Sequence, residues 1–230
     1  MKEILDKIIT DEHLVWDKTL TNKKQKFVAD LNPGTVAELI KRRNELDNLN
    51  ENDLLLLKNE ILEFKKKILD GFGLFIINGA CLKDFSLKEK ISIYTLVAKI
   101  LGELIIQNIK QEKIVEIKDV GKSMQSGGRY HETKEGGSHH TDSPQWEDVP
   151  DYLGLFCVHN AKKGGTNLFL SAYTIHNRIL KGRKDLLNIL YEKFHFDKRG
   201  EFKEGESSTV FEPIFKFKDG KLYFRYLRNY

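Results

Sequence analysis

The sequence predicts an α+β fold in which helices come first and strands follow. Apolar residues at helical spacing dominate the first hundred residues, whereas apolar and polar residues alternate in the segments after about residue 112. The chain of 230 residues shows no internal repeat, no low-complexity segment and no proline-rich linker. This length suits one core with a helical appendage, so we expect helices packed on a β-sandwich or barrel.

The clearest helix is predicted in "NENDLLLLKNEILEFKKKILDGFG". Its apolar side chains share one helical face. They are Leu54, Leu57, Ile61, Phe64 and Ile68. Asn50 is the expected N-cap, and Gly71 is the expected C-terminal stop. The run "GLFIING" that follows predicts a short buried strand, and residues 87–106 return to a helical pattern.

The second half of the chain predicts strands with two helices among them. "KIVEIKDV" alternates as a half-buried strand does. Helices are expected over residues 172–181 and near 184–193. "STVFEPIFKF", the turn "KDG" and "KLYFRYLRNY" predict a closing hairpin.

Composition excludes several classes of protein. The net charge of +4 is a small difference between 38 basic and 34 acidic residues, which does not indicate a nucleic-acid-binding surface. No apolar run approaches the ~18–20 residues that span a membrane, and the N-terminus lacks the apolar core of a signal peptide. Cys81 and Cys157 show neither metal-ligand spacing nor a disulfide framework. We therefore expect a cytoplasmic protein.

The segment "GGSHHTDSPQW" carries the candidate chemistry. Residues two apart on a strand point to the same face, so His140 and Asp142 can converge on one ion, whereas His139 points to the other face. Two histidines and one carboxylate form the ligand set of non-heme Fe(II) oxygenases. The alternative is a polar turn in which Asp142 bonds to nearby backbone N–H groups.

The wider context of this pair resembles a known family. The matching pieces are His140-Thr141-Asp142, "PDYLGLFCV", "GGTNLFLS" and "SAYTIHNRIL", and they occur in that order. Together they resemble the Fe(II)/2-oxoglutarate-dependent dioxygenases of the taurine dioxygenase and clavaminate synthase-like superfamily. The resemblance covers roughly residues 55–230.

This resemblance implies a double-stranded β-helix, or jelly-roll, core with flanking helices. Residues 1–50 would form a helical region packed on the core, and residues 51–230 the oxygenase domain. His140, Asp142 and a distal histidine would bind Fe(II), and 2-oxoglutarate would chelate the metal. Oxidative decarboxylation with O2 would drive hydroxylation of a small molecule, such as an amino acid or a secondary-metabolite intermediate.

Two departures from the family pattern stand out. Thr166 lies one place early in the glycine turn and Asn167 holds the usual position of the threonine, so either could contact the cosubstrate. The distal histidine and the arginine that pairs with 2-oxoglutarate are not found, and the family places them beyond the late hairpin. His195 is a weak candidate for the third ligand, and would suit a cupin-like metal enzyme.

The polar stretch "SMQSGGRYHETKEGG" resembles the substrate-side loop of the family. Gln125, Arg129 and Glu132 could bind a charged substrate there, or the stretch could be a solvated loop. The missing ligands also leave a second hypothesis open. The chain would then be a truncated or non-catalytic member of the fold, acting as a fragment, a binding module or a partner of a second polypeptide that completes the site.

Overall fold

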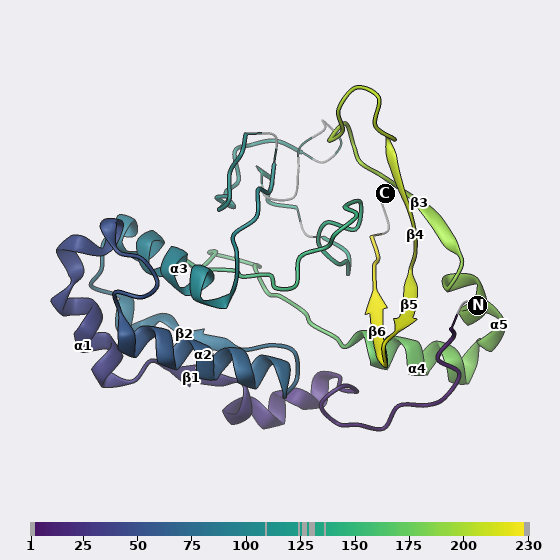
Figure 1. Ribbon diagram of the computed structural model, residues 1–230, viewed down its shortest axis with the longest axis horizontal. Helices are drawn as coiled ribbons and strands as arrows, with labels where there is room; N and C mark the ends of the chain where they lie inside the picture. The colour runs from purple at the N-terminus through teal and green to yellow at the C-terminus, as the bar shows by residue number, and fades with distance from the viewer. Residues whose placement is uncertain are drawn as a thin grey trace. The chain divides into compact units, whose positions relative to one another are not determined.

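The computed structural model describes residues 3–108, 110–123, 125, 128, 132–135 and 137–227 of the chain (Figure 1). Its contacts divide the chain into two compact units. Unit 1 comprises Met1–Ile9, Ile106–Leu153 and Ala161–Tyr230, and unit 2 comprises Thr10–Ile105 and Gly154–Asn160. The helices and small sheets confirm the predicted α+β class.

Unit 2 contains a mostly helical set of elements. In chain order these are η1 (Lys18–Lys26), β1 (Val28–Asp30), α1 (Pro33–Lys41), η2 (Arg43–Asn48), α2 (Leu55–Leu69), β2 (Ile76–Asn78), η3 (Gly79–Leu82) and α3 (Leu87–Leu101). β1 and β2 pair in parallel, with Val28 opposite Ile76. α1 and α2 lie in the connection between these strands, as a parallel pair requires.

The helix α2 confirms the predicted apolar face, but its N-terminus differs from the prediction. Asn50 lies in the turn before the helix, where its side chain accepts a bond from the Asn52 N–H at 2.8 Å. The carboxylate of Glu38 caps the helix instead, because the N–H groups of Leu56 and Leu57 donate to its two oxygens at 3.1 and 2.9 Å. A side chain from α1 therefore satisfies the first turn of α2.

The carboxylate of Glu60 in α2 in turn caps the N-terminus of α1. Asn32, the N-cap of α1, makes no capping bond with its own side chain. Its backbone N–H donates to Glu60 Oε1 of α2 at 2.9 Å. A negative carboxylate is favourable at a helix N-terminus because the helix dipole is positive there. The two helices thus cap each other.

The helix α3 begins at its predicted position and ends at Leu101, before the predicted end at residue 106. Ser86 and Glu89 form a capping box at its start, and Gly102 is its C-cap. The core of unit 2 forms where α1, α2 and α3 meet, and its most buried members include Leu39, Leu57 and Leu96. Burial of such side chains supplies most of the favourable free energy of folding.

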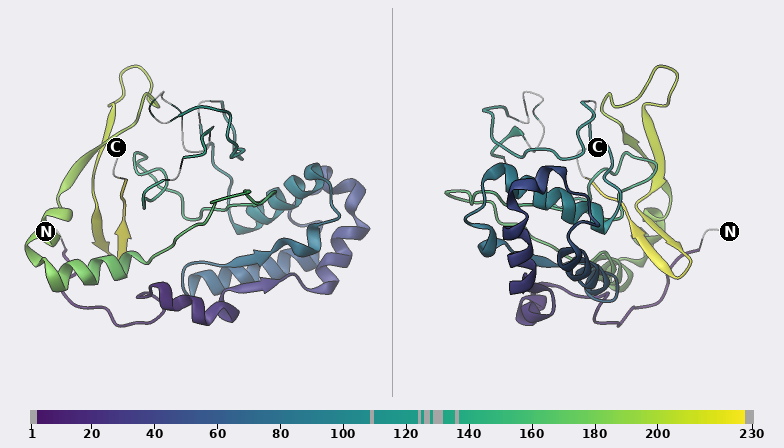
Figure 2. Two further views of the ribbon diagram at one scale, coloured as in Figure 1. Left: turned by 180° about the vertical axis from the view of Figure 1, so that it is seen from behind. Right: turned by 60° about the vertical axis from the view of Figure 1, so that its left-hand side comes forward.

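Unit 1 contains the remaining regular elements (Figure 2). They are α4 (Ala172–Gly182), α5 (Lys184–Leu190), β3 (Lys193–Asp197), β4 (Thr209–Pro213), β5 (Phe215–Lys218) and β6 (Lys221–Phe224). Both predicted helices are therefore confirmed. Ser171 caps α4 by accepting a bond from the Tyr173 N–H at 3.1 Å.

Two antiparallel hairpins follow these helices. β3 pairs with β4, and β5 pairs with β6. The tight turn of the second hairpin contains Asp219 and Gly220 at φ +52° and +74°, which is the left-handed backbone expected of a two-residue hairpin turn. The predicted closing hairpin is confirmed, and Figure 1 shows its turn beside α4.

The N-terminal segment belongs to this same unit, and its described residues contact α4 and Tyr191, the C-cap of α5. The Asn177 side chain accepts from the Ile9 N–H at 3.1 Å and donates to the Ile9 carbonyl at 2.7 Å. The Leu5 N–H donates to the Tyr191 hydroxyl at 3.3 Å. His176, which is fully buried, bonds to the same hydroxyl at 2.9 Å.

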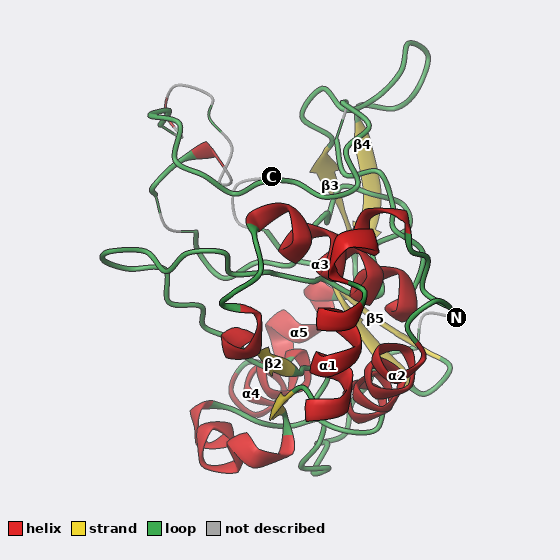
Figure 3. Cartoon of the chain, turned by 90° about the vertical axis from the view of Figure 1, so that its left-hand side faces the viewer, coloured by secondary structure: helices red, strands yellow, loops and turns green. Residues whose placement is uncertain are grey.

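The stretch between α3 and α4 is almost entirely loop in Figure 3. Among its described residues no strand is formed, so the strand predicted over residues 113–120 is wrong in this structure. A strand needs a neighbour to accept and donate its backbone hydrogen bonds, and none is aligned with this segment. The described strands form three two-stranded sheets, so the jelly-roll is implied by the resemblance alone.

Candidate metal centre

His140 and Asp142 face each other across a short gap. The His140 Nε2 atom lies 3.9 Å from the Asp142 Oδ1 atom. That separation exceeds the length of a hydrogen bond but is short enough for one cation to contact both atoms. The two side chains are 32% and 48% exposed, so an ion can reach the gap from solvent.

The ring of His140 is oriented by a neighbouring carbonyl. Its Nδ1 atom lies 2.7 Å from the Ser138 carbonyl oxygen. A carbonyl oxygen can only accept, so this bond places the ring proton on Nδ1 and leaves the lone pair on Nε2. Metal-binding histidines are commonly oriented in this way. His140 therefore presents the nitrogen that a metal requires toward Asp142.

The residue between the two candidate ligands is tied to the chain after β6. Thr141 donates its backbone N–H to the Tyr226 carbonyl at 2.7 Å. The Tyr226 N–H donates to the Thr141 hydroxyl at 3.0 Å, and that hydroxyl lies 3.3 Å from the Tyr226 carbonyl. The side chains of His140 and Asp142, on either side of Thr141, approach to 3.9 Å, although this segment forms no strand.

Arg225 holds the loop that follows Asp142. Its guanidinium donates to the carbonyl oxygens of Pro144, Trp146 and Glu147 at 2.7, 2.5 and 3.3 Å. Its backbone N–H donates to the Ile214 carbonyl at 2.9 Å, which extends the β5–β6 ladder by one bond. This side chain therefore bonds to the backbone of residues 144–147, just after Asp142.

Partial burial changes the electrostatics of this arginine. Loss of hydration lowers the pKa of the Arg225 guanidinium, and the charge of Glu212 partly opposes that shift. The guanidinium carbon also lies 5.8 Å from the centre of the Phe196 ring. An arginine in these surroundings keeps its charge near neutral pH, so its bonds to the three carbonyls are charge-assisted.

The donor atoms present fit a divalent cation, and among the described residues the two predicted ligands, His140 and Asp142, come together. Two metal–ligand bonds of about 2.1 Å span at most about 4.2 Å, so one ion can contact both His140 and Asp142. Within the described part of the chain, no group of three His, Cys, Asp or Glu side chains is placed to hold a metal. The weak candidate His195 bonds through Nδ1 to the Thr209 hydroxyl at 2.8 Å and stacks on Phe211.

The predicted cosubstrate residues lie in an exposed segment. Thr166 and Asn167 are both exposed and belong to no helix or strand. They follow Gly164 and Gly165, which have φ values of +79° and +75°. Two successive residues with positive φ make a turn that favours glycine at both places. The assignment of the two polar residues to 2-oxoglutarate stays a prediction.

The predicted substrate residues are only partly described. Gln125 is exposed. Glu132 forms an ion pair with Lys122 at 2.5 Å, and its carbonyl accepts from the Val120 N–H at 3.1 Å. Arg129 lies outside the described residues. Substrate binding by these residues stays a prediction.

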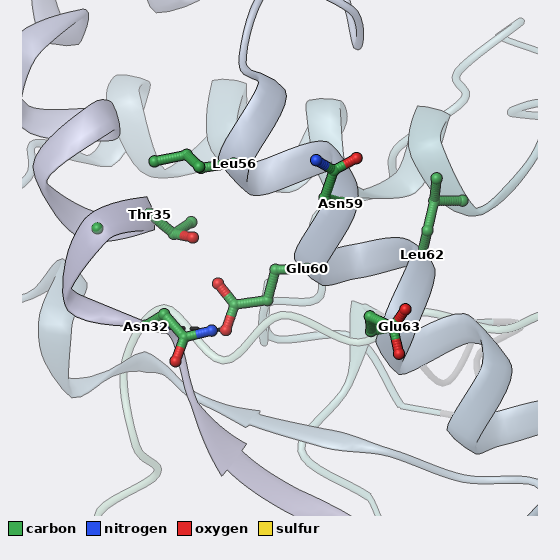
Figure 4. Close-up of a pocket in the computed structure, with 8 residues that line it drawn as sticks. Asn32, Thr35, Leu56, Asn59, Glu60, Leu62 and Glu63 are labelled. Carbon is green, nitrogen blue, oxygen red and sulfur yellow. Dashed lines mark hydrogen bonds between the residues drawn. The ribbon is translucent and has the colours of Figure 1, made fainter.

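A cavity of about 470 Å³ occurs in unit 2 (Figure 4). None of its lining residues is a predicted site residue. Asn32, Thr35 and Glu60 are among its lining residues. The second oxygen of Glu60, Oε2, is shielded from solvent and has no hydrogen-bond partner. The first oxygen caps α1, as described above. The carboxylate of Glu60 is therefore explained by its structural role between α1 and α2.

Sequence reasoning missed the residues that hold the pair in place. Tyr226 and Arg225 contact a segment about eighty positions earlier, at separations such as 85 and 81. The signal available in the sequence was the late hairpin, which predicted that a strand ends near these residues. No local pattern indicates which distant loop such a strand meets.

Known proteins similar to the chain were found by two comparisons. Residues 30–221 match the family described as "Taurine catabolism dioxygenase TauD, TfdA family". The FR-33289 synthase of Streptomyces rubellomurinus (strain ATCC 31215) is 28% identical over 244 aligned positions. That alignment covers 100% of this chain and 69% of the synthase. Both matches include the segment that carries His140 and Asp142.

Proposed function

Because the chain belongs to the TauD/TfdA dioxygenase family, we propose that it is a non-heme Fe(II)/2-oxoglutarate-dependent oxygenase. Its substrate would be a small molecule, such as an amino acid or a secondary-metabolite intermediate, and its product a hydroxylated form of that molecule. The observation that carries the proposal is the approach of His140 Nε2 to Asp142 Oδ1 at 3.9 Å.

His140 and Asp142 are the proposed protein ligands of iron. Bound iron would supply the activation of O2, coupled to oxidative decarboxylation of 2-oxoglutarate. The protein contributes the orientation of its ligands. Ser138 holds the His140 ring through Nδ1, and Thr141 anchors the backbone between the ligands. This arrangement suits a metal site with positions left for the cosubstrate.

Thr166 or Asn167 would contact 2-oxoglutarate, and Gln125, Arg129 and Glu132 would line the substrate side. A hydroxyl or amide in the glycine turn can donate a hydrogen bond to a carboxylate. The exposure of Thr166 and Asn167 supports this role, since neither is consumed by packing. The distal histidine of the family remains the expected third ligand.

We also propose that the chain has the jelly-roll core of its family. Residues 51–230 would form the oxygenase domain, with residues 1–50 as a helical region packed on it. The match of residues 30–221 to the family supports this fold. In the described residues no helix is long and apolar enough to cross a membrane. A cytoplasmic location is part of the same proposal.

A non-catalytic member of the family is the second candidate. It is favoured by one observation, namely that the described residues gather no third metal ligand. The comparisons do not support a second polypeptide that would complete the site. The two candidates differ in a direct measurement, because a non-catalytic protein forms no succinate.

The test combines spectroscopy with product analysis. Protein mixed with Fe(II) and 2-oxoglutarate without oxygen should give the weak visible charge-transfer band of the chelated cosubstrate. Admission of O2 should then release succinate. Absence of both the band and succinate, in protein shown to be folded by circular dichroism, would exclude the oxygenase. A band without succinate would indicate metal and cosubstrate binding alone.

A further inference from the structure

Arg225 and Tyr226 form hydrogen bonds to the chain on both sides of Asp142. Tyr226 pairs with Thr141, the residue immediately before Asp142. Arg225 donates hydrogen bonds to the loop that begins two residues after Asp142, at the carbonyl oxygens of Pro144, Trp146 and Glu147. Arg225 and Tyr226, which follow β6 directly, therefore hold the backbone on both sides of Asp142, a proposed iron ligand.

The Asp142 carboxylate depends on this backbone for its orientation. Among the described residues it makes no side-chain hydrogen bond, and its one ion-pair contact is the 3.9 Å approach to His140. The side chain is 48% exposed, so packing does not hold it either. What keeps Oδ1 opposite His140 Nε2 is the path of the chain through Asp142.

The loop after Asp142 cannot hold this path by itself. It contains one internal backbone bond, from the Trp146 N–H to the Ser143 carbonyl at 3.0 Å. Ser143 has φ +50°, a left-handed conformation that is strained for a residue with a side chain. External bonds must therefore stabilise the turn, and the guanidinium of Arg225 supplies three of them.

Arg225 is itself held firmly. Its backbone N–H continues the β5–β6 ladder through the Ile214 carbonyl, and its guanidinium lies over the Phe196 ring of β3. Arginine offers five donors in a rigid fork, which lets one side chain serve three carbonyls at once. Lysine has one nitrogen and cannot reproduce this geometry.

We infer that Arg225 is a positioning residue for iron binding, which keeps Asp142 opposite His140 by clamping residues 144–147. This inference rests on the proposed function, because it assigns a task toward the same two ligands. Residues that orient metal ligands typically contribute about 10–100-fold to metal affinity. Arg225 touches neither the metal nor its ligands, and acts only through the loop.

The test measures metal affinity and loop order in the full chain. Calorimetric titration with Co(II), an air-stable substitute for Fe(II), should show an affinity about 10–100-fold lower in Arg225→Met than in the wild type. Arg225→Lys should lose a similar amount, because it keeps the charge and the stem but not the fork. Arg183→Met removes an exposed arginine that pairs with Asp185, and should leave the affinity unchanged.

Amide hydrogen exchange separates this inference from the function. In metal-free protein, Arg225→Met should speed exchange across residues 141–148 and leave α4 unchanged. Unaltered exchange in that loop would overturn the inference whether or not metal binds. Wild-type protein that binds no Co(II) would count against the proposed function, while the exchange result would still decide the role of Arg225. If the Arg225→Met variant does not fold, Arg225→Lys takes its place in both measurements. A folded Arg225→Lys variant that binds Co(II) with the affinity of the wild type would also overturn the inference.

Discussion

The helices of unit 2 and the loop stretch between α3 and α4 use their apolar residues in opposite ways. In α2, Leu57 and Ile61 are 0% and 1% exposed. In the loop stretch, Leu153 and Leu168 are 59% and 73% exposed. Both regions are rich in leucine, so composition does not separate them.

The difference lies in where backbone hydrogen bonds come from. A helix satisfies its own backbone, and can bury its apolar face against a single neighbour. An extended segment can bury its side chains only after another strand has satisfied its N–H and C=O groups. The candidate metal pair lies in the second kind of region, where a few long-range bonds hold the chain.

The largest contrast is expected in stability. Leu57→Ala should lower the free energy of unfolding by about 2–5 kcal/mol, because it opens a cavity in a closed core. Leu168→Ala should change it by no more than about 0.5 kcal/mol, because that side chain is already hydrated. Urea unfolding followed by circular dichroism measures both values. Equal losses in the two variants would show that residue 168 is buried in solution.

The next contrast is between two adjacent histidines in the loop region. His140→Ala should weaken Co(II) binding by more than about 100-fold, because it removes a proposed ligand. His139→Ala should leave binding within a factor of about two, because His139 is not one of the two proposed ligands. Calorimetric titration compares them directly. Stronger dependence on His139 than on His140 would reverse the assignment.

Capping of α2 should give a smaller effect on stability. Glu38→Ala should cost about 1 kcal/mol, because the N–H groups of Leu56 and Leu57 lose their acceptor. Asn50→Ala should cost less, since that side chain accepts a bond within the preceding turn. Urea unfolding measures the loss of unfolding free energy in each variant, and hydrogen exchange at the start of α2 shows which side chain caps the helix. A larger loss from Asn50→Ala would restore the sequence prediction.

Acid should affect the two units in different pH windows. Burial lowers the pKa of His176 in unit 1 below its ordinary value of 6.5. The unfolded chain then binds the proton more readily, so stability falls as pH drops below about 6.5. Arg43 and Ser86 lower the pKa of Glu89 in unit 2 from 4.5 to about 2. Its contribution is complete above pH 4.5 and is lost as pH falls toward about 2.

Hydrogen exchange at several pH values distinguishes these windows. Between pH 6.5 and 5, amides of α4 should lose protection while those of α3 keep it. His176→Gln should reduce the pH dependence in α4. Glu89→Gln should lower the protection of α3 above pH 4.5, and this effect should disappear as pH falls toward about 2. Simultaneous loss of protection in both helices above pH 5 would contradict the assignment to separate groups.

The sequence predicted the regular elements well where their pattern is local. The apolar face of α2 and the tight turn at Asp219 and Gly220 both follow from residues a few positions apart. The strand predicted over residues 113–120 failed because alternation specifies a surface for pairing and not the partner. The approach of His140 to Asp142 was predicted because two positions on one extended segment suffice for it.

By itself the sequence determined the helices, the closing hairpin and the family, since each rests on periodicity or on ordered motifs along the chain. Only the tertiary structure decided that Glu38 caps α2, and that Arg225 and Tyr226 hold the segment around Asp142. The contacts of Arg225 and Tyr226 join residues about eighty positions apart. Such contacts depend on how packed elements bring distant backbone groups together, which no local pattern specifies.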